Sequence, residues 1–306
     1  MRPRRAAFPL SIPGPARAAG MADRPGAKSV GAAVPDASRI GRAKEDLEAM
    51  KRHDPRRPVR RAPYTLAIDI GGSHLKASVL DASGAEIARH VEVATPHPSP
   101  PGRVVALIDG MVRTLPAFDR ISVGFPGVVR DGRVITAPNL GTAQWRGFPF
   151  AAKLARRWRK PTRVLNDAEV QCFGVIAGRG LECVLTLGTG MGSALYRDGE
   201  LMPHLELGQH PVWKGHTYDQ YVGNAALEQK GVHKWNRRVR RVIDIVGTLI
   251  HYDRLYLGGG NAKRIDFELP PNVTVVSNEA GITGGVHLWD PALDRYFTPS
   301  NRHGHR

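Results

Sequence analysis

The sequence predicts an α/β protein with two similar lobes that follow a disordered N-terminal extension. Strands and helices alternate through both halves of the folded part, which is typical of this class. A strand, a glycine-rich turn and a second strand occur in that order twice, once from Leu66 and once from Val184. We therefore expect an extension over 1–62, a first lobe over 63–167, a second lobe over 168–290 and a polar tail over 291–306.

Length and composition are those of a chain with a sizeable core. The chain has 306 residues, of which 42% are hydrophobic, enough for one large or two ordinary domains. No apolar run approaches the roughly 18 residues needed to span a membrane, so no membrane partner is expected. Cys172 and Cys183 lie in no CxxC or Cys/His cluster, which excludes a cysteine-based metal site and indicates reduced thiols in a cytoplasmic protein.

The net charge of +16 suggests a nucleic-acid binder until the charge is located. Residues 1–62 hold 15 Lys and Arg against 6 Asp and Glu, so +9 of the excess lies there. That segment is too poor in large apolar residues to fold, and it lacks the patterning of a helix-turn-helix domain. No specific nucleic-acid partner is therefore expected. Met1–Gly20 leaves two interpretations open, a transit peptide or a simple tail.

The folded part opens with a hairpin whose turn is rich in glycine. Residues 66–73 read L-A-I-D-I-G-G-S, and the following strand H-L-K-A-S-V-L turns again at 81–84. Glycines let backbone N–H groups converge on one point, which makes an anion site. Asp69, just before the glycines, could take Mg²⁺ beside a phosphate. The competing interpretation is a buried Asp that bonds the turn amides.

Strands and helices alternate from there to residue 177. Apolar spacing predicts a helix over 102–115 and a buried strand over 121–125. A hairpin over 128–137 follows, turned at its Asp-Gly pair, and leads to Asn139. The next expected elements are a basic amphipathic helix over 148–158, a strand over 163–165 that ends in Asn166-Asp167, and an apolar helix over 168–177.

The second glycine-rich unit reads V-L-T-L-G-T-G-M-G-S over 184–193 and continues as A-L-Y-R-D-G-E-L. It repeats the order strand, turn, strand of the first unit, and a Thr hydroxyl joins the turn amides. One such turn alone is equally well a simple tight turn. Two of them facing each other could hold a polyphosphate between them, with the carboxylate of Asp69 on one side to take the metal.

Helices and short strands complete the second half. The expected elements are a helix over 218–229, a long helix over 234–251, a strand over 255–257 that runs into a Gly-Gly-Gly-Asn turn, a strand over 273–276 and a short Gly-bearing helix over 279–289. The long helix begins with a dense basic stretch that has two open interpretations, a solvated helix face or a track for a long polyanion. Its members are Lys230, His233, Lys234, Arg237, Arg238, Arg240 and Arg241.

The duplicated hairpins, the Asn-Asp strand end and the late glycine turn together resemble the sugar kinases of the ROK family. The resemblance covers residues about 64–290, and the second glycine-rich phrase, followed closely by E-L-G, is most similar to the polyphosphate-dependent glucokinase branch. It implies two actin-like, ribonuclease H-like lobes with a central cleft. It also implies phosphoryl transfer from ATP or polyphosphate to a hexose, glucose above all, with Mg²⁺, in a homodimer.

The resemblance assigns roles to particular positions. Asp167 corresponds to the family's catalytic base, and Asp69 to a residue near the metal. The phosphate loops correspond to Asp69, Gly71 and Gly72 and to Gly188, Thr189 and Gly190. Sugar contacts correspond to Gly127, Asn139, Asn166, Glu206 and Asp219, and the nucleotide or donor would pack on Gly259 and Gly260.

The chemistry of phosphoryl transfer supports the role of Asp167 independently. A carboxylate at the carboxyl end of a strand can take the hydroxyl proton as the new P–O bond forms. The alternative is that Asn166-Asp167 merely caps the following helix. Glu206, between an apolar run and a glycine, is expected to bind sugar rather than to be a plain surface acid.

Two features depart from the family pattern. Most relatives have a His directly after the Gly of E-x-G, and here Gln209 stands in that place with His210 next. The cysteine-rich zinc motif of many relatives is missing, so no structural zinc is expected. The sequence therefore predicts a hexokinase or glucokinase. The competing function is a non-catalytic, sugar-sensing regulator of the same family, although residues 1–62 do not read as the winged helix of such proteins.

Overall fold

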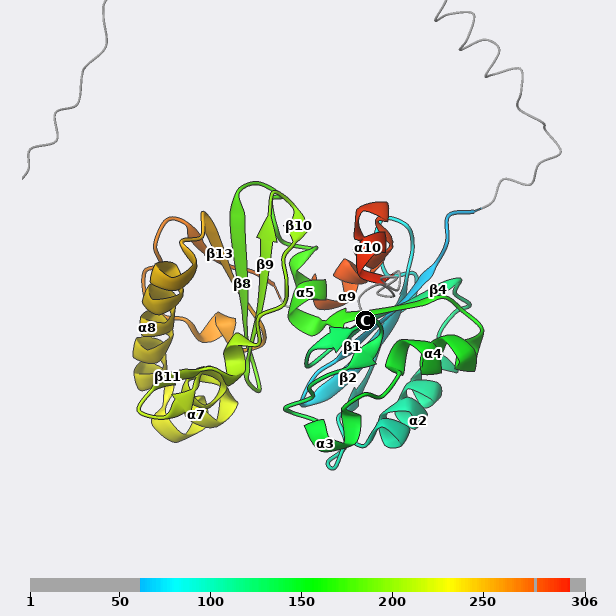
Figure 1. The fold of residues 1–306 in the computed structure, drawn as a ribbon, viewed down its shortest axis with the longest axis horizontal. Coiled ribbons are helices and arrows are strands. Elements are labelled where there is room, and N and C mark those ends of the chain that lie inside the picture. The colour runs from blue at the N-terminus through cyan, green and yellow to red at the C-terminus, as the bar shows by residue number, and fades with distance from the viewer. Residues whose placement is uncertain (1–60, 278–279, 298–306) are drawn as a thin grey trace, which may run out of the picture. The chain divides into compact units, whose positions relative to one another are not determined.

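The computed structural model describes residues 61–277 and 280–297, which belong to one compact unit that begins at Arg61 (Figure 1). The predicted disordered extension lies outside the described residues, apart from residues 61 and 62. Both cysteines are free and buried. Within the described segments, none of the helices combines the length and the apolar character that crossing a bilayer requires.

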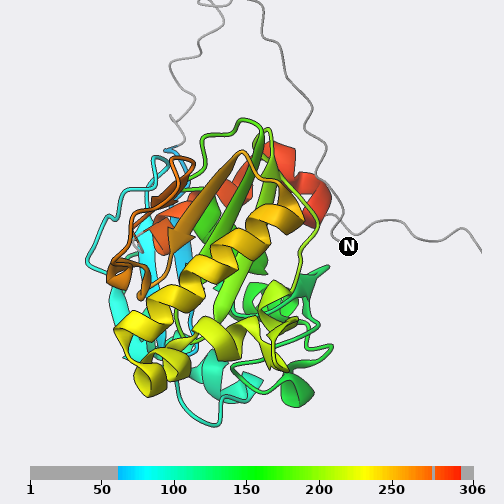
Figure 2. The same cartoon turned by 90° about the vertical axis from the view of Figure 1, so that its left-hand side faces the viewer.

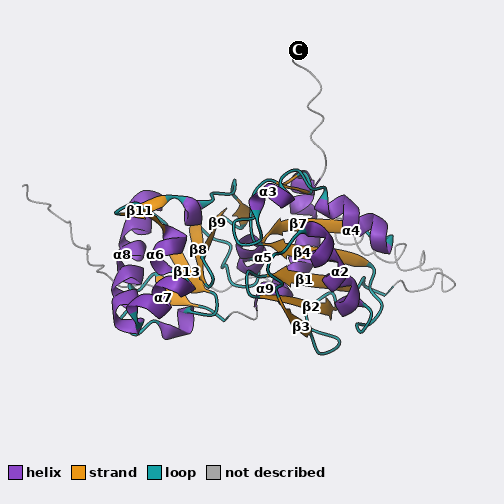
Figure 3. Cartoon of the chain, turned by 90° about the horizontal axis from the view of Figure 1, so that it is seen from below, coloured by secondary structure: helices purple, strands orange, loops and turns teal. Residues whose placement is uncertain are grey.

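The first sheet has five strands in the order β3-β2-β1-β4-β7. Its first three strands are antiparallel neighbours, and β4 and β7 join parallel to β1. Helices α2 and α4 pack on one face (Figure 3), where Trp145, Phe125 and Phe150 form the aromatic part of the core. The strands are β1 (Thr65–Ile70), β2 (His74–Leu80), β3 (Val91–Ala94), β4 (Arg120–Phe125) and β7 (Thr162–Asn166), and the helices are α2 (Pro101–Val112) and α4 (Phe150–Trp158).

The second sheet repeats this plan in the order β10-β9-β8-β13-β14. The strands β8 and β9 form the antiparallel hairpin, and β13 and β14 add in parallel. Its strands are β8 (Leu181–Leu187), β9 (Met191–Arg197), β10 (Glu200–Leu201), β13 (Arg254–Gly258) and β14 (Val273–Val275). The predicted internal duplication and the α/β class are confirmed. In each sheet a glycine-rich turn joins the two strands of the hairpin, β1 to β2 in the first and β8 to β9 in the second.

Helix α8 (Val232–Ile250) covers one face of the second sheet (Figure 2). Its Trp235, Val239 and Val242 are buried against β8 and β13. The single helix predicted over 218–229 was wrong, because it is broken at Gly223 into α6 (Tyr218–Val222) and α7 (Asn224–Lys230). A Cβ at Gly223 would lie 2.5 Å from both Asp219 O and Thr189 O, so the chain bends there against the second glycine-rich turn.

Between the sheets runs α5 (Asp167–Cys172), which ends earlier than the predicted 168–177. The chain then returns after β14 and packs on the first sheet through α9 (Ala280–Thr283) and the 3₁₀ helix Gly284–Trp289. Trp289 Nε1 donates to Ser122 Oγ at 2.8 Å. This segment, expected within the second lobe, therefore lies beside β1 and β4 (Figure 1).

Residues 291–297 are structured, although the sequence suggested a polar tail over 291–306. They form the 3₁₀ helix Pro291–Leu293 and α10 (Asp294–Phe297). Leu293 is buried, and Arg163 stacks on the rings of Trp289 and Phe297. The apolar residues of this short stretch are too few to show a period, which is why they read as a tail.

The remaining elements are short. They are β5 (Val129–Arg130), β6 (Arg133–Val134), α3 (Thr142–Trp145), β11 (Pro211–Trp213), β12 (His216–Thr217) and the 3₁₀ helices Leu207–Gln209 and Ala262–Arg264. The hairpin β5–β6 was predicted from its Asp-Gly turn. The hairpin β11–β12 was not.

Candidate active site

The two glycine-rich turns face each other across the gap between the sheets. Ser73 Oγ in the β1–β2 turn lies 3.1 Å from Thr189 Oγ1 in the β8–β9 turn. A Cβ at Gly72 would lie 3.1 Å from that same Thr189 hydroxyl. A side chain at 72 would therefore crowd Thr189, because the turns approach this closely.

The turns open on a cavity of about 430 Å³, a size that suits a small ligand. Every residue to which the sequence assigned a role lines it, and the chemical roles themselves stay predictions. The lining includes Asp69, Gly71, Gly72, Gly127, Asn139, Asn166, Asp167, Gly188, Thr189, Gly190, Glu206, Asp219, Gly259 and Gly260.

Asp167 is the first residue of α5, at the point where β7 ends. Asn166 caps the helix, accepting from the Ala168 amide at 2.9 Å, and Glu169 closes the capping box by accepting from the Asn166 amide at 3.1 Å. Asp167 Oδ1 also accepts from the Ala168 amide, at 2.8 Å. The capping interpretation is therefore correct for Asn166, while the carboxylate of Asp167 keeps its second oxygen for the cavity that it lines.

Asp69 and Asp167 are close neighbours below the turns. A Cβ at Gly124 would lie 3.2 Å from Asp167 Cα and 3.5 Å from Asp69 Oδ1. Burial raises the pKa of Asp167 to about 8, helped by the charge of Asp69 and opposed by its hydrogen bond to the Ala168 amide. Burial also raises the pKa of Asp69 to about 6, with Lys76 acting in the opposite direction. A carboxylate whose pKa lies near neutrality suits proton abstraction.

Asp69 fits a magnesium ligand. No hydrogen bond to its carboxylate is formed by the residues that the structure describes, so the interpretation of a buried Asp that bonds the turn amides is wrong. The same residues contain no cluster of three or more His, Cys, Asp or Glu side chains that could hold a metal. Mg²⁺ in phosphate-transfer sites needs no such cage, because one or two carboxylates and the substrate phosphates suffice.

Glu206 and Asp219 lie on the second-sheet side of the cavity and differ in how they are held. Glu206 Oε2 accepts one hydrogen bond, from Thr136 Oγ1 at 2.8 Å, which leaves its other oxygen for a ligand. Asp219 accepts from the Met191 amide at 2.7 Å and from Gln209 Nε2 at 2.6 Å. Gln209 thus helps to fix Asp219 next to the second glycine-rich turn.

The part of the cavity at Gly259 and Gly260, which were expected to contact the donor, also contains residues that the sequence analysis missed. Gly259 has φ of +84°, and a Cβ there would lie 2.4 Å from Leu187 O. Asn261 Nδ2 donates to Asn224 Oδ1 at 2.6 Å and tethers the Gly-Gly-Gly-Asn turn to α7. The cavity is also lined here by Lys263 and Arg264. Their position directly after the glycine turn was the available signal.

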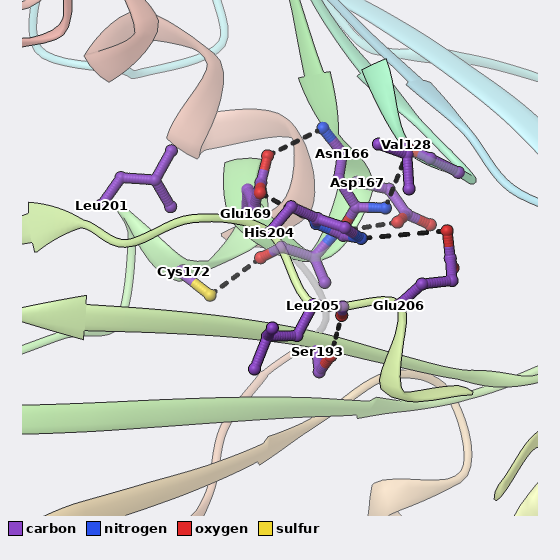
Figure 4. Close-up of polar contacts among 12 residues, drawn as sticks. Val128, Asn166, Asp167, Glu169, Cys172, Ser193, Leu201, His204, Leu205 and Glu206 are labelled. Carbon is purple, nitrogen blue, oxygen red and sulfur yellow. Dashed lines mark hydrogen bonds and ion pairs between the residues drawn. The ribbon is translucent and has the colours of Figure 1, made fainter. Parts of the chain in front are cut away.

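The sequence analysis also missed His204, in the loop after β10. Its Nδ1 lies 2.9 Å from Glu169 Oε1, and its Nε2 lies 3.9 Å from Glu206 Oε2. Figure 4 shows the ring between these two carboxylates, on the side of Asp167. No spacing rule could have found it, because its partners are brought together only by the fold.

Five of the seven residues of the basic stretch line a separate groove of about 380 Å³, formed by α6, α7 and α8. Arg241 stacks on the Trp213 ring at 3.7 Å, and Arg238 stacks on the Tyr221 ring at 4.6 Å. Within 61–277 and 280–297, no carboxylate forms an ion pair with the cations that line this groove. They are Lys230, Lys234, Arg237, Arg238 and Arg241.

Comparison with known proteins agrees with this geometry. The sequence pattern of the ROK family matches residues 65–224. The polyphosphate glucokinase of Mycobacterium leprae (strain TN) is 32% identical over 241 residues, which are 72% of this chain and 72% of that protein. The polyphosphate glucokinase of Mycobacterium tuberculosis (strain CDC 1551 / Oshkosh) is 31% identical over 240 residues, which are 73% of this chain and 90% of that protein.

Solved structures give the same result. The inorganic polyphosphate/ATP-glucomannokinase from Arthrobacter sp. strain KM superposes with a TM-score of 0.68 at 29% identity, covering 74% of this chain and 97% of that one. A ROK family glucokinase from Streptomyces griseus, solved with glucose and AMPPNP, shares the fold with a TM-score of 0.61 at 21% identity, over 74% of this chain and 98% of that one. The chain therefore belongs to the ROK family.

Proposed function

We propose that this sugar kinase transfers a phosphoryl group from polyphosphate or ATP to the 6-hydroxyl of glucose or a related hexose. The observation that carries the proposal is the position of Asp167, a carboxylate with a raised pKa in a cavity lined by two facing glycine turns. The similarity to polyphosphate glucokinases supports the sugar and donor classes.

The sugar and the phosphoryl donor would bind to different residues of the cavity. Glu206, Asn139 and Asn166 would hold sugar hydroxyls, and Asp167 would take the proton of the attacking hydroxyl as the P–O bond forms. The amides of both turns would hold the phosphates, because glycine turns leave N–H groups accessible. Asp69 would hold Mg²⁺, which supplies neutralisation of the donor's charge when bound.

A direct assay tests the proposal. Purified protein is incubated with Mg²⁺ and a panel of hexoses, with ATP and polyphosphate as separate donors, and sugar phosphate is measured. We expect glucose 6-phosphate with at least one donor. Failure with every hexose and both donors would refute the kinase assignment. Specific binding of genomic fragments would then support the competing function of a sugar-sensing regulator. The similarity to known kinases does not favour that function.

The separate basic groove gives a prediction about the donor. If it holds the distal part of a long polyphosphate, the triple change K230Q/K234Q/R237Q should raise the KM for long-chain polyphosphate about tenfold and reduce its dependence on salt. The KM values for tetraphosphate and ATP should not change. These three side chains are exposed.

A matched control separates this from a general charge effect. R113Q/K153Q/R156Q removes the same charge from exposed positions on α4 and at the end of α2. Equal KM changes in both triple variants, or none in either, would favour the solvated helix face.

A further inference from the structure

His204 bridges two carboxylates, Glu169 and Glu206, through contacts that the proposed reaction leaves without a role. It follows β10 of the second sheet, its side chain is 14% exposed, and it does not line the cavity. Its ring nevertheless lies between Glu169 of α5 and Glu206 of the cavity wall (Figure 4). Each ring nitrogen faces a different carboxylate.

The Nδ1 side of the ring supports α5. Nδ1 donates to Glu169 Oε1 at 2.9 Å, because a carboxylate can only accept. The other oxygen of Glu169 accepts the Asn166 amide and closes the capping box. This bond therefore anchors the second-lobe loop to the turn of helix that carries Asp167.

The hydrogen bonding of the other ring nitrogen, Nε2, is incomplete. Nε2 is buried and has no hydrogen-bond partner within the described residues. Glu206 Oε2 lies 3.9 Å from it, too far for a hydrogen bond. A buried polar atom without a partner costs stability, so a shift of Glu206 by about 1 Å toward the ring would remove that cost.

The charges around the ring favour a proton on Nε2. Burial lowers the pKa of His204, but Glu169, Glu206 and Asp167 outweigh it, and the net direction is upward. A protonated Nε2 is a donor aimed at Glu206. A neutral ring would instead place a lone pair opposite a carboxylate.

We infer that His204 is a positioning residue that couples the sugar-facing carboxylate Glu206 to the helix carrying Asp167, one ring nitrogen serving each. The inference rests on the proposed function, in which Glu206 binds the hexose. Sugar binding brings Glu206 within reach of Nε2–H, and the Nδ1 contact keeps Asp167 in place for that bound sugar.

Two substitutions test the roles of the two ring nitrogens of His204 separately. His204→Asn places an amide N–H near the position of Nδ1 and has nothing at Nε2, whereas His204→Gln reaches the position of Nε2 and has nothing at Nδ1. We expect His204→Asn to keep kcat and the unfolding temperature but to weaken glucose binding about tenfold. We expect His204→Gln to keep glucose affinity but to lose about tenfold in kcat and several degrees in unfolding temperature. His204→Gln loses the Nδ1 bond to Glu169, whereas His204→Asn loses only the Nε2–Glu206 bond that we propose for the sugar-bound state.

The measurements are glucose binding by calorimetry, steady-state kinetics and thermal unfolding, with His216→Asn at an exposed site as control. The opposite pattern, or equal effects of Asn and Gln on all three quantities, would overturn the coupling, as would a His204→Ala variant that behaves like wild type. An inactive wild-type protein would instead refute the proposed function. The Nδ1 contact is then still tested by the unfolding temperatures, which require no substrate.

Discussion

Replacing Asp167 by Asn should reduce turnover by about 10³-fold or more, while glucose affinity stays within a few-fold. The amide has the shape of the carboxylate but cannot accept the hydroxyl proton. Steady-state kinetics and glucose calorimetry measure the two quantities separately. Near-normal turnover in this variant, or in Asp167→Ala, would remove Asp167 as the base.

The same substitution should stabilise the unliganded protein. The folded-state pKa of Asp167 is about 8, against 3.8 for an ordinary Asp, so between these values the folded state binds more protons than the unfolded state. The free energy of unfolding therefore falls as pH rises through this window. Asp167→Asn should unfold at a higher temperature than wild type, by a margin that grows from pH 5 to pH 8. Over the same window, kcat/KM of the wild type should rise as Asp167 ionises.

Glu182 provides a matched control. It is also buried, but it accepts hydrogen bonds from the amides of residues 177 and 178 and from Tyr256 Oη, all within 2.8 Å. Glu182→Gln should lower the unfolding temperature and leave kcat unchanged, the reverse of Asp167→Asn. If Asp167→Asn lowered the unfolding temperature as Glu182→Gln is expected to, the environment assigned to Asp167 would be wrong.

The sequence predicted the parts of the site that follow from local chemistry. The two glycine turns follow runs of β-favouring residues, and Asp167 follows a strand, so their edge positions could be inferred from order alone. That the turns face each other could be hypothesised from the duplication, and the Ser73–Thr189 contact bears this out. The duplication is informative because it predicts two similar glycine-rich turns, one in each lobe.

The parts that could not be predicted depend on contacts between distant residues. His204 and Glu169 are 35 positions apart, and neither belongs to a glycine turn or a strand end. The return of residues 284–289 to the first sheet depends on Gly285, where a Cβ would lie 2.9 Å from Ala67 Cβ. The break at Gly223 likewise reflects crowding by Thr189, because α6 and α7 together have an ordinary helical pattern. Local propensity carries no information on such packing.

Replacing Asp69 by Asn should abolish the rise in unfolding temperature that Mg²⁺ causes together with a donor. It should also lower turnover by about 10²-fold or more. No described side chain or loop amide donates a hydrogen bond to the carboxylate of Asp69, which adjoins both the first glycine-rich turn and Asp167. In the wild type, Mg²⁺ with a non-hydrolysable donor should raise the unfolding temperature, since ligands that bind only the folded state stabilise it.

The Asn variant should lose that rise in unfolding temperature but keep the rise caused by glucose. Glu86→Gln removes the same charge from an exposed position on the same lobe and should respond to both ligands like wild type. The two acids are also coupled, because the charge of Asp69 raises the pKa of Asp167. Asp69→Asn should therefore move the pH-dependent loss of stability due to Asp167 to lower pH. An Asp69→Asn variant with a normal Mg²⁺ response would show that the metal is held elsewhere.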